Sequence, residues 1–381
     1  MSSTVKSIKI TYNPINEKNT FTSGDWVTGQ VTLEVTKECQ IDSLLVQFKG
    51  KAEVLWTERH GQVTVVYHSK EKYFSLKHYY VRDKDVRGED NESLITKQNG
   101  ETYSSVVAPG CHVYPFSFQI PCQTMPHSFT GLVGKIYYTL KTKLGRSMRI
   151  DQKDKVKINY VSNAAMSAEI DVMMPQHESK DKKMKFFTSG SVAMDVRLEK
   201  SGFYQGEGLK VIACIENNSS REIKPKYCVY RKHSFFANGR RRLSTKDLLK
   251  EVGQPIPPST NVKVSQIITI PEDAEPSILN CGIIKAEYRL RVYLDVKYAS
   301  DPEIKFPIVI MPAGQVSAKA PPPAASDFGF EPFGNTNPPQ WGGVPPQPPT
   351  APYSLDPPPP YGAHAMYPPL TDSGNSYQRL N

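Results

Sequence analysis

Residues 26–35 have the sequence WVTGQVTLEV, in which apolar and polar side chains alternate. Successive side chains of a strand point to opposite faces, so this pattern buries one face and exposes the other. Similar short segments, rich in β-branched and aromatic residues and bounded by Gly, Pro, Asn or Asp, follow at 5–12, 41–48, 63–67, 114–120, 135–142 and 156–160. The expected fold is therefore all-β, with antiparallel strands packed into sandwiches.

One segment has a helical pattern instead. Residues 243–252 read LSTKDLLKEV, in which Leu248, Leu249 and Val252 share one face of a helix. Ser244 or Thr245 is a suitable N-cap residue. We expect one or two helical turns there, attached to a loop.

The strand-rich region contains an internal repeat. Residues 21–25 (FTSGD) match 203–207 (FYQGE), and 118–121 (FQIP) match 268–271 (ITIP). The matches keep their order but differ in offset, which places extra residues in the middle of the first copy, between Lys51 and Gly110. The glycine before the acidic residue in 21–25 and in 203–207 suits a tight turn with positive φ.

The repeat and the change in composition near the C-terminal end divide the 381 residues into four expected parts. Residues 1–161 form a first sandwich, 162–185 a connection, 186–311 a second sandwich and 312–381 a tail. The tail holds 18 of the 32 prolines and few aliphatic residues. Such a segment buries too little surface to offset its conformational entropy, so it is expected to be disordered with polyproline II character.

Composition limits the classes of function. No apolar stretch is long enough to cross a membrane, and no signal peptide is visible at the start. The six cysteines form no CxxC pair and are interpreted as small buried residues of a cytoplasmic protein. No P-loop, dinucleotide, zinc-protease or nucleophile-elbow motif occurs, so we expect no enzyme activity, cofactor or metal site. Proteins that bind RNA combine basic residues with interleaved aromatic residues on which the bases stack. This pattern is missing here, so nucleic acid is not an expected partner.

The formal net charge is +9, and because the tail alone is acidic the first 311 residues are more basic still. A basic body favours acidic partners such as phosphorylated peptides or anionic lipids. The candidate contact residues are basic side chains on the first strand and in the densest basic cluster: Lys6, Lys9, Arg231, Lys232, Arg240, Arg241 and Arg242. The alternative interpretation, which the sequence supports equally, is that the basic cluster at 240–242 is the solvated tip of a hairpin.

The chain resembles the arrestin-domain-containing proteins, or α-arrestins. The resemblance covers roughly residues 1–311 and rests on Phe21-Thr-Ser-Gly24-Asp25, Val86-Arg87-Gly88-Glu89, Pro109-Gly110-x-His112-x-Tyr114-Pro115-Phe116, Ser128-Phe129-x-Gly131-x-x-Gly134, Phe203-Tyr204-Gln205-Gly206-Glu207, Ile223-x-Pro225-Lys226 and Lys285-x-Glu287-Tyr288. It implies two arrestin-type, immunoglobulin-like sandwiches. It also implies an adaptor for membrane cargo such as receptors or transporters, cytoplasmic and peripheral at the plasma membrane and endosomes.

The tail contains a PPxY motif at Pro358, Pro359, Pro360 and Tyr361. WW domains bind such segments in an aromatic-lined groove, and the three-residue repeat of polyproline II places Pro358 and Tyr361 on one face. The resemblance implies that the partner is a HECT-type ubiquitin ligase with WW domains. Many relatives carry two such motifs, whereas here APY at 351–353 and YPP at 367–369 do not match, so the avidity of a second motif is absent.

Two other functions remain open at this point. A sorting-coat scaffold of the same fold uses the body to bind coat subunits and the tail as a spacer. An enzyme with an unrecognised site on the sandwich, such as a hydrolase, is a more distant alternative.

Overall fold

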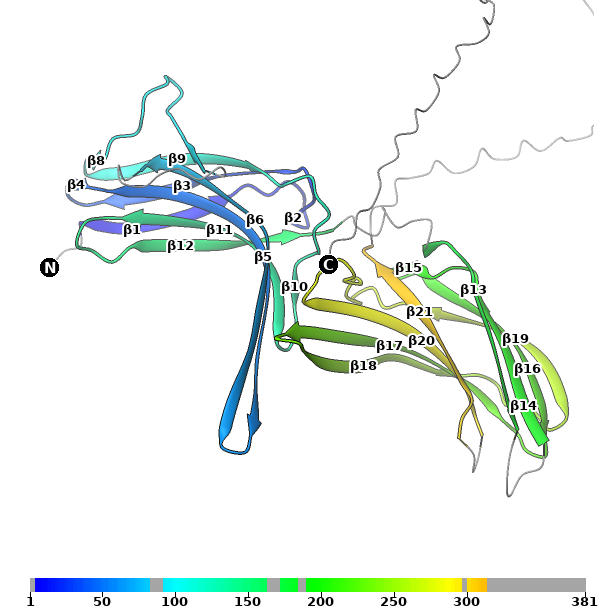
Figure 1. The fold of residues 1–381 in the computed structure, drawn as a ribbon. Helices are drawn as coiled ribbons and strands as arrows, with labels where there is room; N and C mark the ends of the chain where they lie inside the picture. Colours follow the sequence, from blue (N-terminus) through cyan, green and yellow to red (C-terminus); the bar gives the residue numbers. More distant parts are fainter. Residues whose placement is uncertain (1–3, 83–91, 163–171, 184–189, 297–299, 314–381) are drawn as a thin grey trace, which may run out of the picture. The chain divides into compact units, whose positions relative to one another are not determined.

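The computed structural model describes residues 4–82, 92–162, 172–183, 190–296 and 300–313. The regular elements within these ranges are strands, which form two sandwiches (Figure 1). The predicted all-β class is therefore confirmed. None of the described residues belongs to a helix that has the length and apolar character needed to span a bilayer.

The first sandwich consists of two main sheets and a short two-stranded ladder. One sheet has the order β1-β3-β9, the other β2-β12-β11-β5-β6-β7 with β10 paired to β11, and the ladder is β4-β8. The strands are β1 (Val5–Tyr12), β2 (Thr20–Phe21), β3 (Trp26–Val35), β4 (Cys39–Gln40), β5 (Ser43–His60), β6 (Val63–Val81), β7 (Glu92–Leu94), β8 (Val106–Val107), β9 (Gly110–Gln119), β10 (Phe129–Thr130), β11 (Gly134–Gly145) and β12 (Gln152–Tyr160).

The second sandwich has sheets of order β13-β14-β16-β19 and β15-β21-β20-β17-β18. Its strands are β13 (Gln176–Lys183), β14 (Gly190–Leu198), β15 (Gly202–Tyr204), β16 (Gly208–Ser219), β17 (Lys224–Ala237), β18 (Arg240–Val252), β19 (Thr260–Thr269), β20 (Ile284–Asp295) and β21 (Glu303–Met311).

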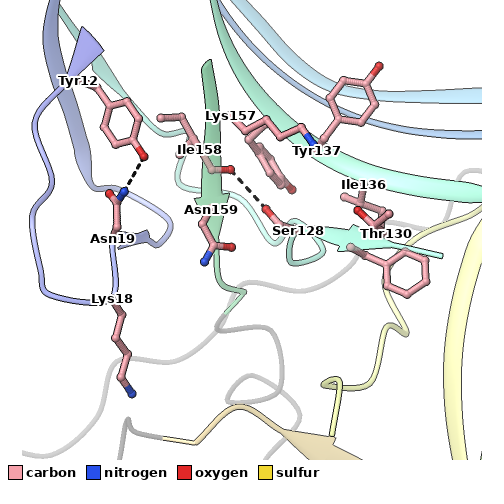
Figure 2. A pocket seen from close by; sticks show the side chains of 12 residues that line it. Tyr12, Lys18, Asn19, Ser128, Thr130, Ile136, Tyr137, Lys157, Ile158 and Asn159 are labelled. Carbon is pink, nitrogen blue, oxygen red and sulfur yellow. Dashed lines mark hydrogen bonds between the residues drawn. The ribbon is translucent and has the colours of Figure 1, made fainter. Parts of the chain in front are cut away.

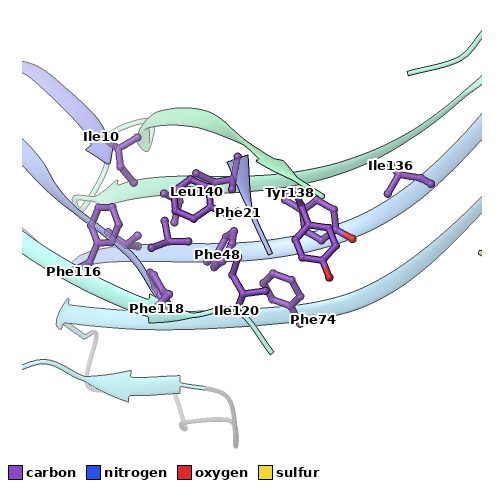
Figure 3. Packing of buried hydrophobic residues seen from close by; sticks show 14 of the residues in the cluster. Ile10, Phe21, Phe48, Phe74, Phe116, Phe118, Ile120, Ile136, Tyr138 and Leu140 are labelled. Atoms are coloured by element: carbon purple, nitrogen blue, oxygen red, sulfur yellow. The ribbon is translucent and has the colours of Figure 1, made fainter. Parts of the chain in front are cut away.

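Side chains alternate between core and solvent along the central strands. In β5 every second residue from Leu44 to Trp56 is buried, and β20 shows the same alternation from Ile284 to Leu294. Aromatic side chains fill the first core: the ring of Phe48 lies 4.9 Å from that of Phe74 and 5.9 Å from that of Phe118 (Figure 3). Full burial of one such side chain stabilises the fold by about 1.5–3 kcal/mol. The apolar residues that alternate in the sequence thus form the two inner faces of each sandwich.

The predicted repeat is confirmed by matching hydrogen bonds in the two sandwiches. Gly24 (φ +85°) and Gly206 (φ +81°) both have positive φ, and their N–H groups donate to the carbonyls of Ile120 and Ile270, respectively. A parallel pair closes each sheet, β2 with β12 and β15 with β21. Among the described residues, β7 and β8 have no counterpart in the second sandwich, which agrees with the extra residues expected between Lys51 and Gly110.

Three sequence-based expectations are corrected. The expected helix at 243–252 is wrong, because these residues belong to strand β18 and pair with β17. The expected connection 162–185 contains a strand, since β13 pairs along its length with β14. Of the six cysteines only Cys228 and Cys281 are buried. The exposed ones lie at outward-facing strand positions or in a loop, namely Cys111, Cys122 and Cys214.

The β5–β6 hairpin is longer than the sheet that carries it. Strand β11 pairs with β5 only as far as Val54, and Leu55 N–H donates to the carbonyl of Val133 just before β11, so residues 56–60 and 63–67 pair only with each other. This two-stranded ribbon turns away from β11 and β12 and projects beyond them (Figure 1). Its outer side exposes Leu55 and Val66, while Trp56 and Tyr67 stack on the other side with ring centroids 5.1 Å apart.

Candidate functional site

The candidate lysines of the first strand lie at the edge of the first sandwich. Lys6 and Lys9 are exposed on β1, which pairs only with β3 in its sheet. Lys6 Nζ is 2.6 Å from Glu34 Oε1, and this hydrogen bond raises the pKa of Lys6 and lowers that of Glu34. Both side chains are open to solvent, which screens the pair, so it adds little to stability. Lys6 therefore presents a partly compensated charge.

Arg231 belongs to a partly buried ionic group rather than to a free basic surface. Its Nη1 lies 2.6 Å from Glu275 Oε2, which also accepts a hydrogen bond from His233 Nε2 at 3.1 Å. Burial alone would raise the pKa of Glu275, but the His233 hydrogen bond and the Arg231 charge outweigh it and lower the pKa. The carboxylate stays ionised and neutralises Arg231.

The remaining candidates divide between the two faces of the β17–β18 hairpin. The register places Arg240 opposite Ala237, and Arg242 opposite Phe235, on the side that also carries Arg231. Lys232 lies on the other side together with Arg241, which donates a 2.7 Å hydrogen bond to Ser234 Oγ. The seven candidate residues thus do not converge on one contact surface.

A group of side chains that the sequence reading missed joins the two sandwiches. Phe129 of β10 packs edge-on against His233 of β17, with ring centroids 5.2 Å apart. Tyr73 of β6 donates from its hydroxyl to Cys281 Sγ at 3.4 Å, and Gly282 N–H donates to Glu71 Oε2 at 2.8 Å. These residues are distant in sequence and carry no common motif, so only the fold reveals them.

The first sandwich also has a polar pocket of about 390 Å³ (Figure 2). It lies where the β11–β12 pairing ends at Tyr138 and Ile158, next to the short strand β10. Asn19 donates to the Tyr12 hydroxyl at 2.8 Å, and Ser128 Oγ lies 3.5 Å from the carbonyl of Ile158. No nucleophile paired with a histidine occurs among the residues that line it, so the lining does not form a catalytic pair.

The PPxY residues Pro358, Pro359, Pro360 and Tyr361 lie outside the described residues. Their role in binding WW domains stays a prediction. The start of the tail is described as far as Ala313, whose N–H donates to Gln205 Oε1 at 2.7 Å.

Comparison with known proteins places both sandwiches in one family. The model of the arrestin (or S-antigen) N-terminal domain matches residues 8–166, and that of the C-terminal domain matches 188–314. Arrestin domain-containing protein 4 of Homo sapiens is 30% identical over 309 residues, which cover 80% of this chain and 71% of that protein. The mouse protein of the same name is 28% identical over 80% of the chain and 72% of its own length. Thioredoxin-interacting protein of Rattus norvegicus is 27% identical over 80% and 74%, respectively. Both arrestin domain models match the chain, and the relatives align with 80% of it. The chain therefore belongs to the α-arrestin, or arrestin-domain-containing, family.

Proposed function

We propose that this protein is an adaptor that links membrane cargo, such as receptors or transporters, to a WW-domain HECT-type ubiquitin ligase, and so directs the cargo to endocytosis and endosomal transport. Membership of the α-arrestin family supports an adaptor or scaffold role. The observation that carries the finer proposal is the PPxY sequence at 358–361, which follows two arrestin domains on the same chain.

The physical basis of ligase recruitment is the fit of a polyproline segment to a WW groove. The prolines stack on the groove's aromatic side chains, and the tyrosine ring enters a neighbouring pocket. Because the chain carries a single motif, its attachment to a ligase with several WW domains gains no avidity from a second one. We therefore expect weak, readily reversible ligase binding.

Tyr361→Ala tests this proposal directly. The substitution should abolish co-purification with WW-domain ligases and leave the thermal unfolding of the two sandwiches unchanged. Two further tail tyrosines offer matched controls: Tyr353→Ala and Tyr367→Ala change the same residue type outside a PPxY context and should retain binding. Ligase binding that survives in Tyr361→Ala would remove the mechanism.

Deletion of residues 312–381 separates the adaptor from a sorting-coat scaffold of the same fold. An adaptor of the proposed kind should still bind its cargo after the deletion but should no longer promote cargo ubiquitination and sorting. A scaffold that works through the body alone should sort cargo normally. The measurement is the surface level and ubiquitination of cargo in cells that express either chain.

A further inference from the structure

The outer side of the larger sheet in the first sandwich carries a cluster of lysines that the candidate residues above did not include. We call it the lysine face. Strand register brings it together: Thr139 of β11 lies opposite Lys157 of β12 on one side and Lys49 of β5 on the other, and Lys141 lies opposite Lys155. The members come from three neighbouring strands and are Lys49, Lys51, Lys135, Lys141, Lys155 and Lys157.

Carboxylates balance only part of this charge. Glu53 lies 3.3 Å from Lys51 and 3.9 Å from Lys135. Within the part of the chain that the structure describes, the other four lysines of the face form no ion pair. Burial lowers the pKa of Lys49, and the charges of Lys51, Lys141 and Lys155 lower it further. The lysine face therefore has an excess of positive charge that a bound anion would offset.

The centre of the lysine face holds a buried hydroxyl without a partner. Thr139 is only 6% exposed, and its Oγ1 forms no hydrogen bond with any described residue. Its neighbours Tyr138 and Leu140 point into the core, so Thr139 points to the outer side, between the stems of Lys49 and Lys157. A buried hydroxyl without a hydrogen bond is costly, and an anionic oxygen placed among these amines would accept one from Thr139. This observation, independent of the charge, points to a ligand at the same place.

The spacing of the lysines indicates the form of that ligand. Lys155 and Lys157 alternate along β12, as do Lys49 and Lys51 along β5, so each pair is separated by about 6.6 Å. An extended polypeptide with acidic residues at alternate positions presents carboxylates at the same interval. A planar membrane fits less well, because the β5–β6 ribbon projects from the same sheet beyond β11 and β12 (Figure 1).

We propose that the lysine face binds an extended segment of a partner protein that carries carboxylates at alternate positions, one of which accepts the hydrogen bond of Thr139. The inference deepens the adaptor function, on which it rests for the identity of the partner as cargo. The basic surface that recognises an acidic partner is then on β5, β11 and β12, rather than on β1 and the β17–β18 hairpin.

The test measures binding of a fluorescein-labelled peptide of five Glu-Ser repeats to the full chain by fluorescence anisotropy at low salt. A peptide with Gln in place of Glu should not bind, and one with the same residues in two blocks, all Glu and then all Ser, should bind several-fold more weakly. Lys49→Gln/Lys155→Gln/Lys157→Gln should weaken binding of the alternating peptide about tenfold, because three favourable charge pairs with the peptide are lost. The charge-matched control Lys37→Gln/Lys246→Gln/Lys263→Gln, which changes exposed lysines elsewhere, should bind as the unmodified chain does.

Thr139→Val tests the centre of the site without a change in charge or shape. Since valine keeps the branched side chain and removes only an unpartnered hydroxyl, the thermal midpoint should stay the same or rise, while peptide binding weakens several-fold. Unchanged peptide binding in the lysine triple variant or in Thr139→Val overturns the site. So does equal binding of the block peptide, or binding to phosphatidylserine vesicles alone. Failure here is distinguishable from failure of the ligase proposal, because Tyr361→Ala should leave peptide binding intact.

Discussion

Two tyrosines in equivalent positions of the repeat allow a matched test of how burial sets the value of a hydrogen bond. Tyr138 donates from its hydroxyl to the carbonyl of Pro126 at 2.6 Å, and Tyr288 donates to the carbonyl of Glu275 at 2.6 Å. Both rings are buried, and burial raises the pKa of both hydroxyls, so they remain protonated donors at neutral pH. The two acceptors differ, because Pro126 is buried whereas Glu275 is half-buried.

Tyr138→Phe should therefore cost more than Tyr288→Phe. The first change leaves a carbonyl in the core without a partner, at about 1–3 kcal/mol. In the second, water can replace the lost donor, and the cost should approach the net value of one hydrogen bond, about 1 kcal/mol or less. For domains of this size each kcal/mol lowers the thermal midpoint by about 2–4 °C.

Amide hydrogen exchange is the suitable assay, because a chain with two sandwiches need not unfold in one step. Exchange of amides in β11 reports on the first sandwich, and exchange of amides in β20 reports on the second. Each variant should speed exchange mainly in its own sandwich, and Tyr138→Phe should do so more strongly. An equal or larger effect of Tyr288→Phe would refute the argument that acceptor burial sets the difference.

Two further substitutions test packing and charge. Gly50→Ala would place a methyl group 2.5 Å from the Tyr138 ring and 2.8 Å from the Phe74 ring. We expect it to lower the stability measured by thermal unfolding by about 1–3 kcal/mol. Gly208→Ala is the control and should cost less, because its methyl group would contact only the Ile267 side chain, at 3.0 Å. Burial favours protonation of Glu53, but hydrogen bonds from His68, Tyr137 and Lys51 outweigh it and lower its pKa to about 2 from 4.5. Its stabilising effect is complete above pH 4.5 and is lost as the pH falls toward 2, so Glu53→Gln should flatten the fall of the thermal midpoint across that range. An unchanged acid profile would exclude these hydrogen bonds as its cause.

The sequence alone was enough to predict the strands that bury one face, because their apolar residues alternate. The prediction failed for strands that form through pairing with a neighbouring strand and lack this alternation. In β18 the register passes from Val229–Leu249 to Tyr230–Asp247 and leaves Leu248 as the extra residue of a bulge. Leu248 and Leu249 are both half-buried as a result, and the adjacent leucines gave a helix-like pattern. Tertiary pairing with β17 overrides that local preference.

Polar strands, and surfaces to which several strands contribute, also could not be predicted from the sequence. Strand β13 reads QHESKDKK, without an apolar period, and it is a strand because it pairs with β14 at the edge of a sheet. The alternating lysines of β12 are visible in the sequence, but the register that brings them beside Lys49 and Thr139 is not. The PPxY motif, in contrast, was found from sequence alone because its recognition depends on a short local segment.

The position of β21 affects how the second sandwich responds to mechanical load. This strand lies between β15 and β20, and the chain leaves it at Met311 to enter the C-terminal arm. Its two neighbours hold successive parts of the strand, because β15 pairs only with residues 309–311 and β20 pairs with residues 303–308. A force applied through the arm therefore loads the three residue pairs between β21 and β15 first, and the six residue pairs between β21 and β20 resist only after those have opened.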